Sequence, residues 1–76
     1  MTDEYVQLLA DLQEEAAIQM TVDRLEAGED PLDILDDMKE AMRIVGDRYE
    51  NEDYFIPDLM YAGEILDQIS ELMKDE

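Results

Sequence analysis

The sequence contains no cysteine and no histidine. Without cysteine, disulfide bonds and thiolate metal sites are excluded, and nothing points to secretion. Without histidine, the chain lacks the commonest metal ligand, the usual general base and the side chain that ordinarily titrates near neutral pH. We therefore expect no catalytic residue and no metal ligand in this chain.

Basic residues are also scarce: five lysines and arginines stand against 23 acidic side chains, a net charge of −18. Nucleic acids and anionic membranes bind clustered basic side chains, so neither is an expected partner. The acidity suits a solubilised surface, a basic protein partner or a saline cytoplasm, and a solvated acidic face is the ordinary explanation. No apolar run approaches the roughly 18 residues of a membrane span, and the N-terminus lacks the basic region of a signal peptide. These features predict a soluble, cytoplasmic protein.

The apolar content is sufficient for one small domain. Apolar residues make up 46% of the 76 positions, which predicts a folded chain with a thin core. No segment has the alternation of a strand. Glycine and proline occur at only five positions and divide the chain into helical segments: Gly28, Pro31, Gly46, Pro57 and Gly63.

The first two predicted helices lie before Gly28. Apolar residues at helical spacing run from Thr2 to Leu12, and polar residues 13–15 then interrupt the pattern. The second segment begins near Ala17. It stops at Gly28, a residue suited to the left-handed conformation that ends many helices.

The third and fourth predicted helices each start at a proline. Asp30 and Pro31 form a capped start, and Pro57 begins the last helix. In both helices apolar residues recur at steps of 3, 4, 3 and 4, the seam of helices that pack at a shallow angle. The two seams are Leu35, Met38, Met42, Val45 and Tyr49, and Leu59, Ala62, Leu66, Ile69 and Met73.

Four helices joined by short connections predict an all-α, antiparallel four-helix bundle. The residues expected at its centre are Leu35, Met38, Met42, Val45, Leu66 and Ile69. Gly46 lies inside the third helix, where glycine costs about 1 kcal/mol relative to alanine. We expect a neighbouring backbone to approach closely there; the alternative is a simple weak point.

The start of the fourth helix has more apolar surface than a bundle helix needs, since one stripe about 100° wide suffices. Ile56, Met60 and Gly63 lie on one side, while Phe55, Leu59, Ala62 and Ile65 line another. Both sides cannot face the same neighbours in so small a domain. We expect part of this surface to be exposed and to bind a partner, unless the first helix covers it.

Two segments resemble a known family: LEAGEDPLDIL (residues 25–35) and MRIVGDRYENEDYFIPDLMYAGEIL (residues 42–66). The shared pattern is a glycine before Asp-Pro, then Met-x-x-Val-Gly, an aromatic residue, a short acidic turn and Phe-aliphatic-Pro-Asp-Leu. From its first to its last residue, 25–66, it spans a little over half of the chain. It resembles the N-terminal helical cap domain of corrinoid (cobalamin-binding) methyltransferase proteins, which also occurs in the cobalamin-binding region of methionine synthase.

The resemblance implies a function and a site. In that family the cap is a four-helix bundle over the upper, methyl-carrying face of the corrinoid, and it shields a reactive cobalt centre. The implied cofactor contacts in this sequence are Phe55, Leu59, Ala62 and Ile65. The implied partners are a C-terminal cobalamin-binding domain and methyltransferase subunits. Cobalamin is expected in the full-length protein and not on this chain alone.

One feature departs from the family. The cobalt-binding half there is a separate Rossmann-like domain with an Asp-x-His-x-x-Gly motif, and this chain has no histidine. We therefore expect residues 1–76 to be a single cap domain, excised or stand-alone, without the Rossmann-like domain. The alternative is a stand-alone acidic protein-interaction or dimerisation module, whose apolar surface binds a partner helix or a second copy. In isolation we expect the chain to form a homodimer through the surface from Phe55 to Ile65.

Overall fold

The computed structural model describes residues 2–74, which form four α-helices and no strand. The helices are α1 (Thr2–Ala10), α2 (Glu14–Glu26), α3 (Pro31–Glu50) and α4 (Ile56–Lys74). The predicted all-α fold is confirmed. Within this part of the chain, no helix is long and apolar enough to cross a membrane.

The helix ends follow from local chemistry. The Asp30 carboxylate accepts a hydrogen bond from the Leu32 backbone N–H at 3.0 Å, which caps α3 as predicted. Gly28, after α2, has a φ of +87°, the left-handed conformation expected for it. At the start of α4, the Asp58 side chain accepts from the Phe55 backbone N–H at 2.9 Å. Two side-chain hydrogen bonds thus set where the two long helices begin, and the conformation of Gly28 sets where α2 ends.

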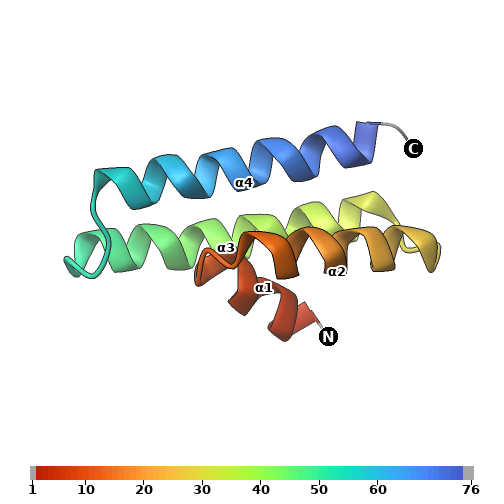
Figure 1. Ribbon diagram of the computed structural model, residues 1–76. Helices are drawn as coiled ribbons and strands as arrows, with labels where there is room; N and C mark the ends of the chain where they lie inside the picture. Colours follow the sequence, from red (N-terminus) through yellow and green to blue (C-terminus); the bar gives the residue numbers. More distant parts are fainter. Residues whose placement is uncertain (1, 75–76) are drawn as a thin grey trace.

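The three longer helices alternate in direction along the chain, and α4 packs against both α2 and α3 (Figure 1). The short helix α1 also packs against α2 and α3, at an angle to them. The molecule measures 37 × 20 × 18 Å. Its long dimension is set by α3 and α4, because a helix of 20 residues is about 30 Å long. The side of the bundle on which α3 and α4 pack together therefore runs along its long dimension.

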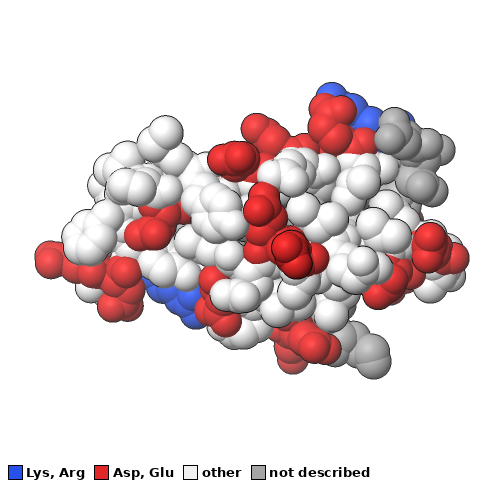
Figure 2. Space-filling view, in the orientation of Figure 1, with Lys and Arg blue, Asp and Glu red and all other residues white. Residues whose placement is uncertain are grey.

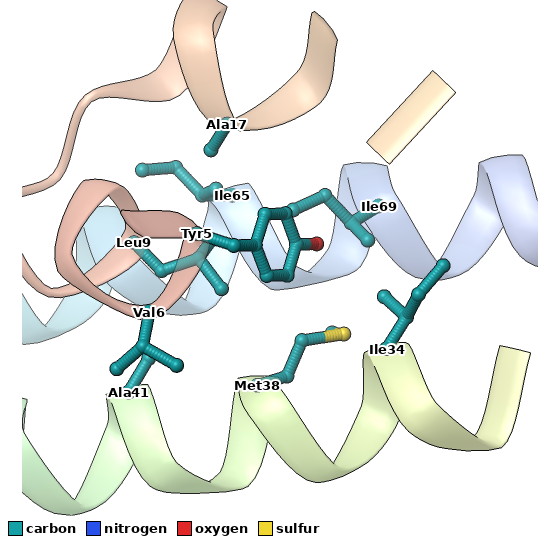
Figure 3. Close-up of a cluster of buried hydrophobic side chains, with 9 residues drawn as sticks. All are labelled: Tyr5, Val6, Leu9, Ala17, Ile34, Met38, Ala41, Ile65 and Ile69. Atoms are coloured by element: carbon teal, nitrogen blue, oxygen red, sulfur yellow. The ribbon is translucent and has the colours of Figure 1, made fainter. Parts of the chain in front are cut away.

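The main core cluster draws residues from all four helices (Figure 3): Tyr5, Val6, Leu9, Ala17, Ile34, Met38, Ala41, Ile65 and Ile69. The Tyr5 ring lies in the middle, between side chains of α3 and α4. Its hydroxyl is 2.7 Å from Thr21 Oγ1, so the one polar atom at the centre is satisfied. A second cluster consists of Ala10, Val45 and Ala62.

The predicted core centre is confirmed at three positions and wrong at three. Met38, Val45 and Ile69 are buried. Leu35 is exposed, and Met42 and Leu66 are only half-buried. The buried stripe of α3 is instead Ile34, Met38, Ala41 and Val45. The buried stripe of α3 is rotated relative to the predicted seam because α3 packs against α1 as well as α4. The spacing of apolar residues along α3 carries no information about its contact with α1.

The expectation that a neighbouring backbone approaches Gly46 is also wrong. A Cβ placed on Gly46 would meet no atom within 4 Å, so no neighbouring backbone approaches it. The residue is exposed on α3. The alternative explanation, a weak point in the helix, agrees with this geometry.

Candidate functional site

The start of α4 carries large apolar side chains that the bundle does not cover. Phe55, Ile56 and Met60 are 61%, 54% and 70% exposed. We refer to these three residues as the α4 apolar patch. In Figure 2 the outer surface over the start of α4 is largely white, although Asp58 lies in the first turn of this helix, and acidic residues are scattered over much of the rest of that face. The predicted exposure is confirmed, and α1 does not cover the patch.

The four predicted cofactor contacts fall in different environments. Phe55 is exposed, and Leu59 is half-buried against the cluster that contains Val45. Ala62 and Ile65 are only 4% and 1% exposed, so the expectation that they lie on the free surface is wrong. Ile65 shares the main core with residues of α1, α2 and α3.

Within α4, the exposed apolar side is therefore the one that carries Ile56 and Met60, and Phe55, which precedes the helix, is exposed with it. Met60 is two residues before Ala62, which places the two side chains about 200° apart around the helix. When Ala62 and Ile65 face the core, Ile56 and Met60 must face outward. The sequence showed that one apolar side had to be free, but not which one.

The turn that leads into the patch is held by backbone hydrogen bonds. The Arg48 carbonyl accepts from the N–H groups of both Asp53 and Tyr54, at 2.8 and 3.1 Å. Glu52 has a φ of +67°, a left-handed conformation that is uncommon outside glycine. At the other end of the turn, the Asp58 carboxylate is occupied by the Phe55 N–H. The chain thus reaches Phe55 in a defined direction.

Side chains tie this turn to the end of α1. Arg48 Nη1 lies 2.9 Å from the Ala10 carbonyl oxygen, 2.8 Å from Asp11 Oδ1 and 3.0 Å from the Tyr54 hydroxyl. Tyr54 also donates to the Ala10 oxygen at 2.6 Å. Hydrogen bonds to Asp11 and Tyr54 raise the pKa of Arg48 above its ordinary value, so its charge is permanent. Nothing in the sequence pattern predicted this cluster, because its members lie far apart along the chain.

A second apolar feature lies on the flank between α3 and α4. It is a shallow hollow of about 340 Å³, lined by Leu35, Met38, Lys39, Met42 and Leu66. Four of these residues were predicted at the core centre, and all of them except Met38 are exposed or half-buried. The displaced seam therefore forms a groove on the outside of the bundle.

No metal centre is present among residues 2–74, because no three acidic, histidine or cysteine side chains come together to hold an ion. The polar groups nearest the patch serve the fold. Tyr61, for example, donates to Glu14 at 3.2 Å. Loss of solvation, followed by the charge of Glu14, raises the pKa of the Tyr61 phenol. The α4 apolar patch is therefore an apolar contact area on a charged molecule.

Comparison with known proteins agrees with this description. A family model described as "B12 binding domain" matches residues 1–74. The chain therefore belongs to this family of helical, corrinoid-associated domains, and the resemblance found from the sequence is confirmed.

The relatives it matches are corrinoid proteins. It is 32% identical over 59 residues to Monomethylamine corrinoid protein 1 of Methanosarcina mazei, covering 76% of this chain and 27% of that protein. It is 30% identical over 60 residues to Monomethylamine corrinoid protein 2 of Methanosarcina acetivorans, covering 78% and 28%. The chain thus spans about a quarter of the length of these curated relatives. No solved structure matches it.

Proposed function

We propose that this chain is the cap module of a corrinoid methyl-carrier protein and that it shields the upper face of cobalamin during methyl transfer. The observation that supports this best is the α4 apolar patch. A chain of net charge −18 leaves Phe55, Ile56 and Met60 exposed together at one helix start. Burying such a surface against an apolar partner is favourable, and an exposed cluster of this kind usually marks a binding surface.

The residues of the patch fit the face of a corrin ring. Phe55 and Met60 offer broad apolar surface without a titratable group, and the nearby Asp58 carboxylate is turned back to the Phe55 amide. Cobalamin would supply the methyl-carrying cobalt. Phe55, Ile56 and Met60 would contact its upper face and exclude water and oxidants, with Leu59 at the edge of the contact. Ala62 and Ile65 would support these residues from inside the bundle.

The other parts of the site must come from elsewhere. The chain has no histidine that could bind the cobalt from below. We therefore infer a cobalamin-binding domain and methyltransferase subunits as its partners, in a cytoplasmic protein. The names of its relatives support this inference, since both are called monomethylamine corrinoid proteins.

The proposal can be tested in a chimaera in which this chain replaces the matching segment of Monomethylamine corrinoid protein 1. Phe55→Ala and Met60→Ala should each speed the oxidation of the Co(I) form, because they open the apolar shield. Their melting temperatures should change little, since both side chains are largely exposed. Co(I) loss is followed by absorbance after reduction, and unfolding by circular dichroism.

Two controls separate shielding from stability. Leu32→Ala removes an equally exposed apolar side chain from the start of α3, outside the patch, and should leave Co(I) oxidation unchanged. Ile34→Ala empties part of the core and should lower stability by about 2–5 kcal/mol. If the two patch variants oxidise no faster than Leu32→Ala, the proposed shielding role is wrong.

A further inference from the structure

Two arginines of α3 have different surroundings. The Arg43 side chain is 60% exposed, and its ion pairs with Glu40 and Asp47 remain within its own helix. The Arg48 side chain is only 27% exposed, and its partners come from two other parts of the chain, the end of α1 and the turn before α4. Arg43 therefore links nothing beyond α3, while Arg48 joins α1, α3 and the turn before α4.

Arg48 and Tyr54 both donate hydrogen bonds to the same carbonyl group, that of Ala10. The Ala10 oxygen belongs to the last turn of α1, where carbonyls have no partner within the helix. It accepts from both Arg48 and the Tyr54 hydroxyl, while the guanidinium lies 5.5 Å from the centre of the Tyr54 ring. A positive charge at a helix C-terminus is also favoured by the helix dipole. The side chain of Tyr54 is thus fixed at both its ring and its hydroxyl.

This fixed tyrosine is the residue directly before Phe55. The backbone N–H of Tyr54 is bound to the Arg48 carbonyl, and its ring packs against the cluster of Ala10, Val45 and Ala62. The Phe55 side chain is 61% exposed, and its backbone N–H is bound to the Asp58 carboxylate at the start of α4. The direction of Phe55 is therefore set by what holds Tyr54 on one side and by the cap of α4 on the other.

We propose that Arg48 is a positioning residue: together with Tyr54 it anchors the 51–55 turn to α1 and so holds Phe55, the member of the α4 apolar patch that precedes the helix, in its outward orientation. The effect of Arg48 on cofactor protection rests on the proposed cap function, whereas its effect on the 51–55 turn does not. These two effects can be measured separately.

The turn is tested on the 76-residue chain by amide hydrogen exchange, followed by NMR. Arg48→Met keeps the length of the side chain but removes the guanidinium, and Tyr54→Phe removes only the hydroxyl. In Arg48→Met, the amides of Asp53 and Tyr54 should exchange about tenfold faster, as expected for loss of hydrogen bonds to a charged group. Tyr54→Phe should act in the same direction and serves as the test if Arg48→Met does not fold.

Two control variants test whether the loss of the Arg48 guanidinium is what speeds exchange in the turn. Arg43→Met removes a guanidinium from the same helix and should leave both turn amides unchanged. Ile34→Val destabilises the whole bundle but removes no contact of the turn, so exchange at the amides of Asp53 and Tyr54 should stay unchanged. If either control speeds exchange at Asp53 and Tyr54 as much as Arg48→Met does, the positioning role is overturned.

The functional consequence is tested in the chimaera described above. Arg48→Met should speed Co(I) oxidation towards the rate of Phe55→Ala, and Arg43→Met should not. If the turn loosens in Arg48→Met while both Phe55→Ala and Arg48→Met leave the cobalt chemistry unchanged, the positioning role stands and the cap function fails. If Phe55→Ala speeds oxidation but Arg48→Met loosens nothing and changes no rate, the positioning role is wrong and the cap function stands.

Discussion

At the scale of single residues, the hydrogen bond between Tyr5 and Thr21 shows how a small core handles polarity. Thr21 Oγ1 donates to the Ala17 carbonyl at 2.8 Å, so the Tyr5 hydroxyl is left to donate to Thr21. Both side chains are fully buried. The two partners are therefore not equivalent: without Tyr5, Thr21 still has a partner in Ala17, but without Thr21, the Tyr5 hydroxyl has none.

This asymmetry predicts unequal effects of removing the same bond. Tyr5→Phe should lower the free energy of unfolding by about 0.5–1.5 kcal/mol, the net value of a typical hydrogen bond. Thr21→Val should lower it by about 1–3 kcal/mol, because it buries a hydroxyl without a partner. The double variant should be more stable than Thr21→Val alone. Urea unfolding of the four proteins measures this, and equal losses in the two single variants would contradict it.

At the scale of helices, α1 depends on the rest of the molecule. A helix of nine residues is marginal in water by itself, because nucleation is costly. It is held by Tyr5, Val6 and Leu9 in the core and by Arg48 at its last turn. The two long helices start instead at well-formed caps, at Asp30 and before Asp58. Local sequence thus sets α3 and α4, while tertiary contacts maintain α1.

Two glycines on or after helices should respond in opposite ways to alanine. Gly46→Ala should raise the free energy of unfolding by up to about 1 kcal/mol, since a Cβ there meets nothing and alanine favours the helix. Gly28→Ala should lower it by about 1–2 kcal/mol, because the φ of +87° is strained for an L-residue. Thermal and urea unfolding of both variants test this. A loss of stability in Gly46→Ala would show that the glycine has a role that the geometry does not reveal.

At the scale of the whole molecule, charge and apolar surface oppose each other. The net charge of −18 makes two copies repel, and salt screens this repulsion. The α4 apolar patch favours association, because burying even a few hundred Å² contributes roughly 25 cal/mol per Å². The balance between the two should depend on ionic strength.

We therefore predict that the 76-residue chain dimerises through the patch as salt is raised. Sedimentation velocity at low and high salt should show the change in mass. Met60→Glu places a charge in the patch and should abolish the dimer, while Leu32→Glu, on α3, adds the same charge outside it and should not. A protein that stays monomeric at high concentration and high salt would refute this prediction.

The sequence alone determined the features that depend on neighbouring residues. Asp30 and Pro31 start α3, and Gly28 ends α2, because each acts on backbone groups within one helical turn. The excess of apolar residues from Phe55 to Leu66 also showed, without any structure, that part of α4 must remain exposed. The family pattern lies in the same local segments, which is why it could be recognised.

Only the tertiary structure decided which side of each helix faces inward. The choice of Ile34 over Leu35, and of Ala62 over Met60, depends on where α1 and α2 pack, and helical spacing does not contain that information. The link from Arg48 to Ala10 joins residues 38 positions apart. Its existence follows from the meeting of α1 with α3, because a hydrogen bond needs two groups brought together in space, whatever their separation along the chain.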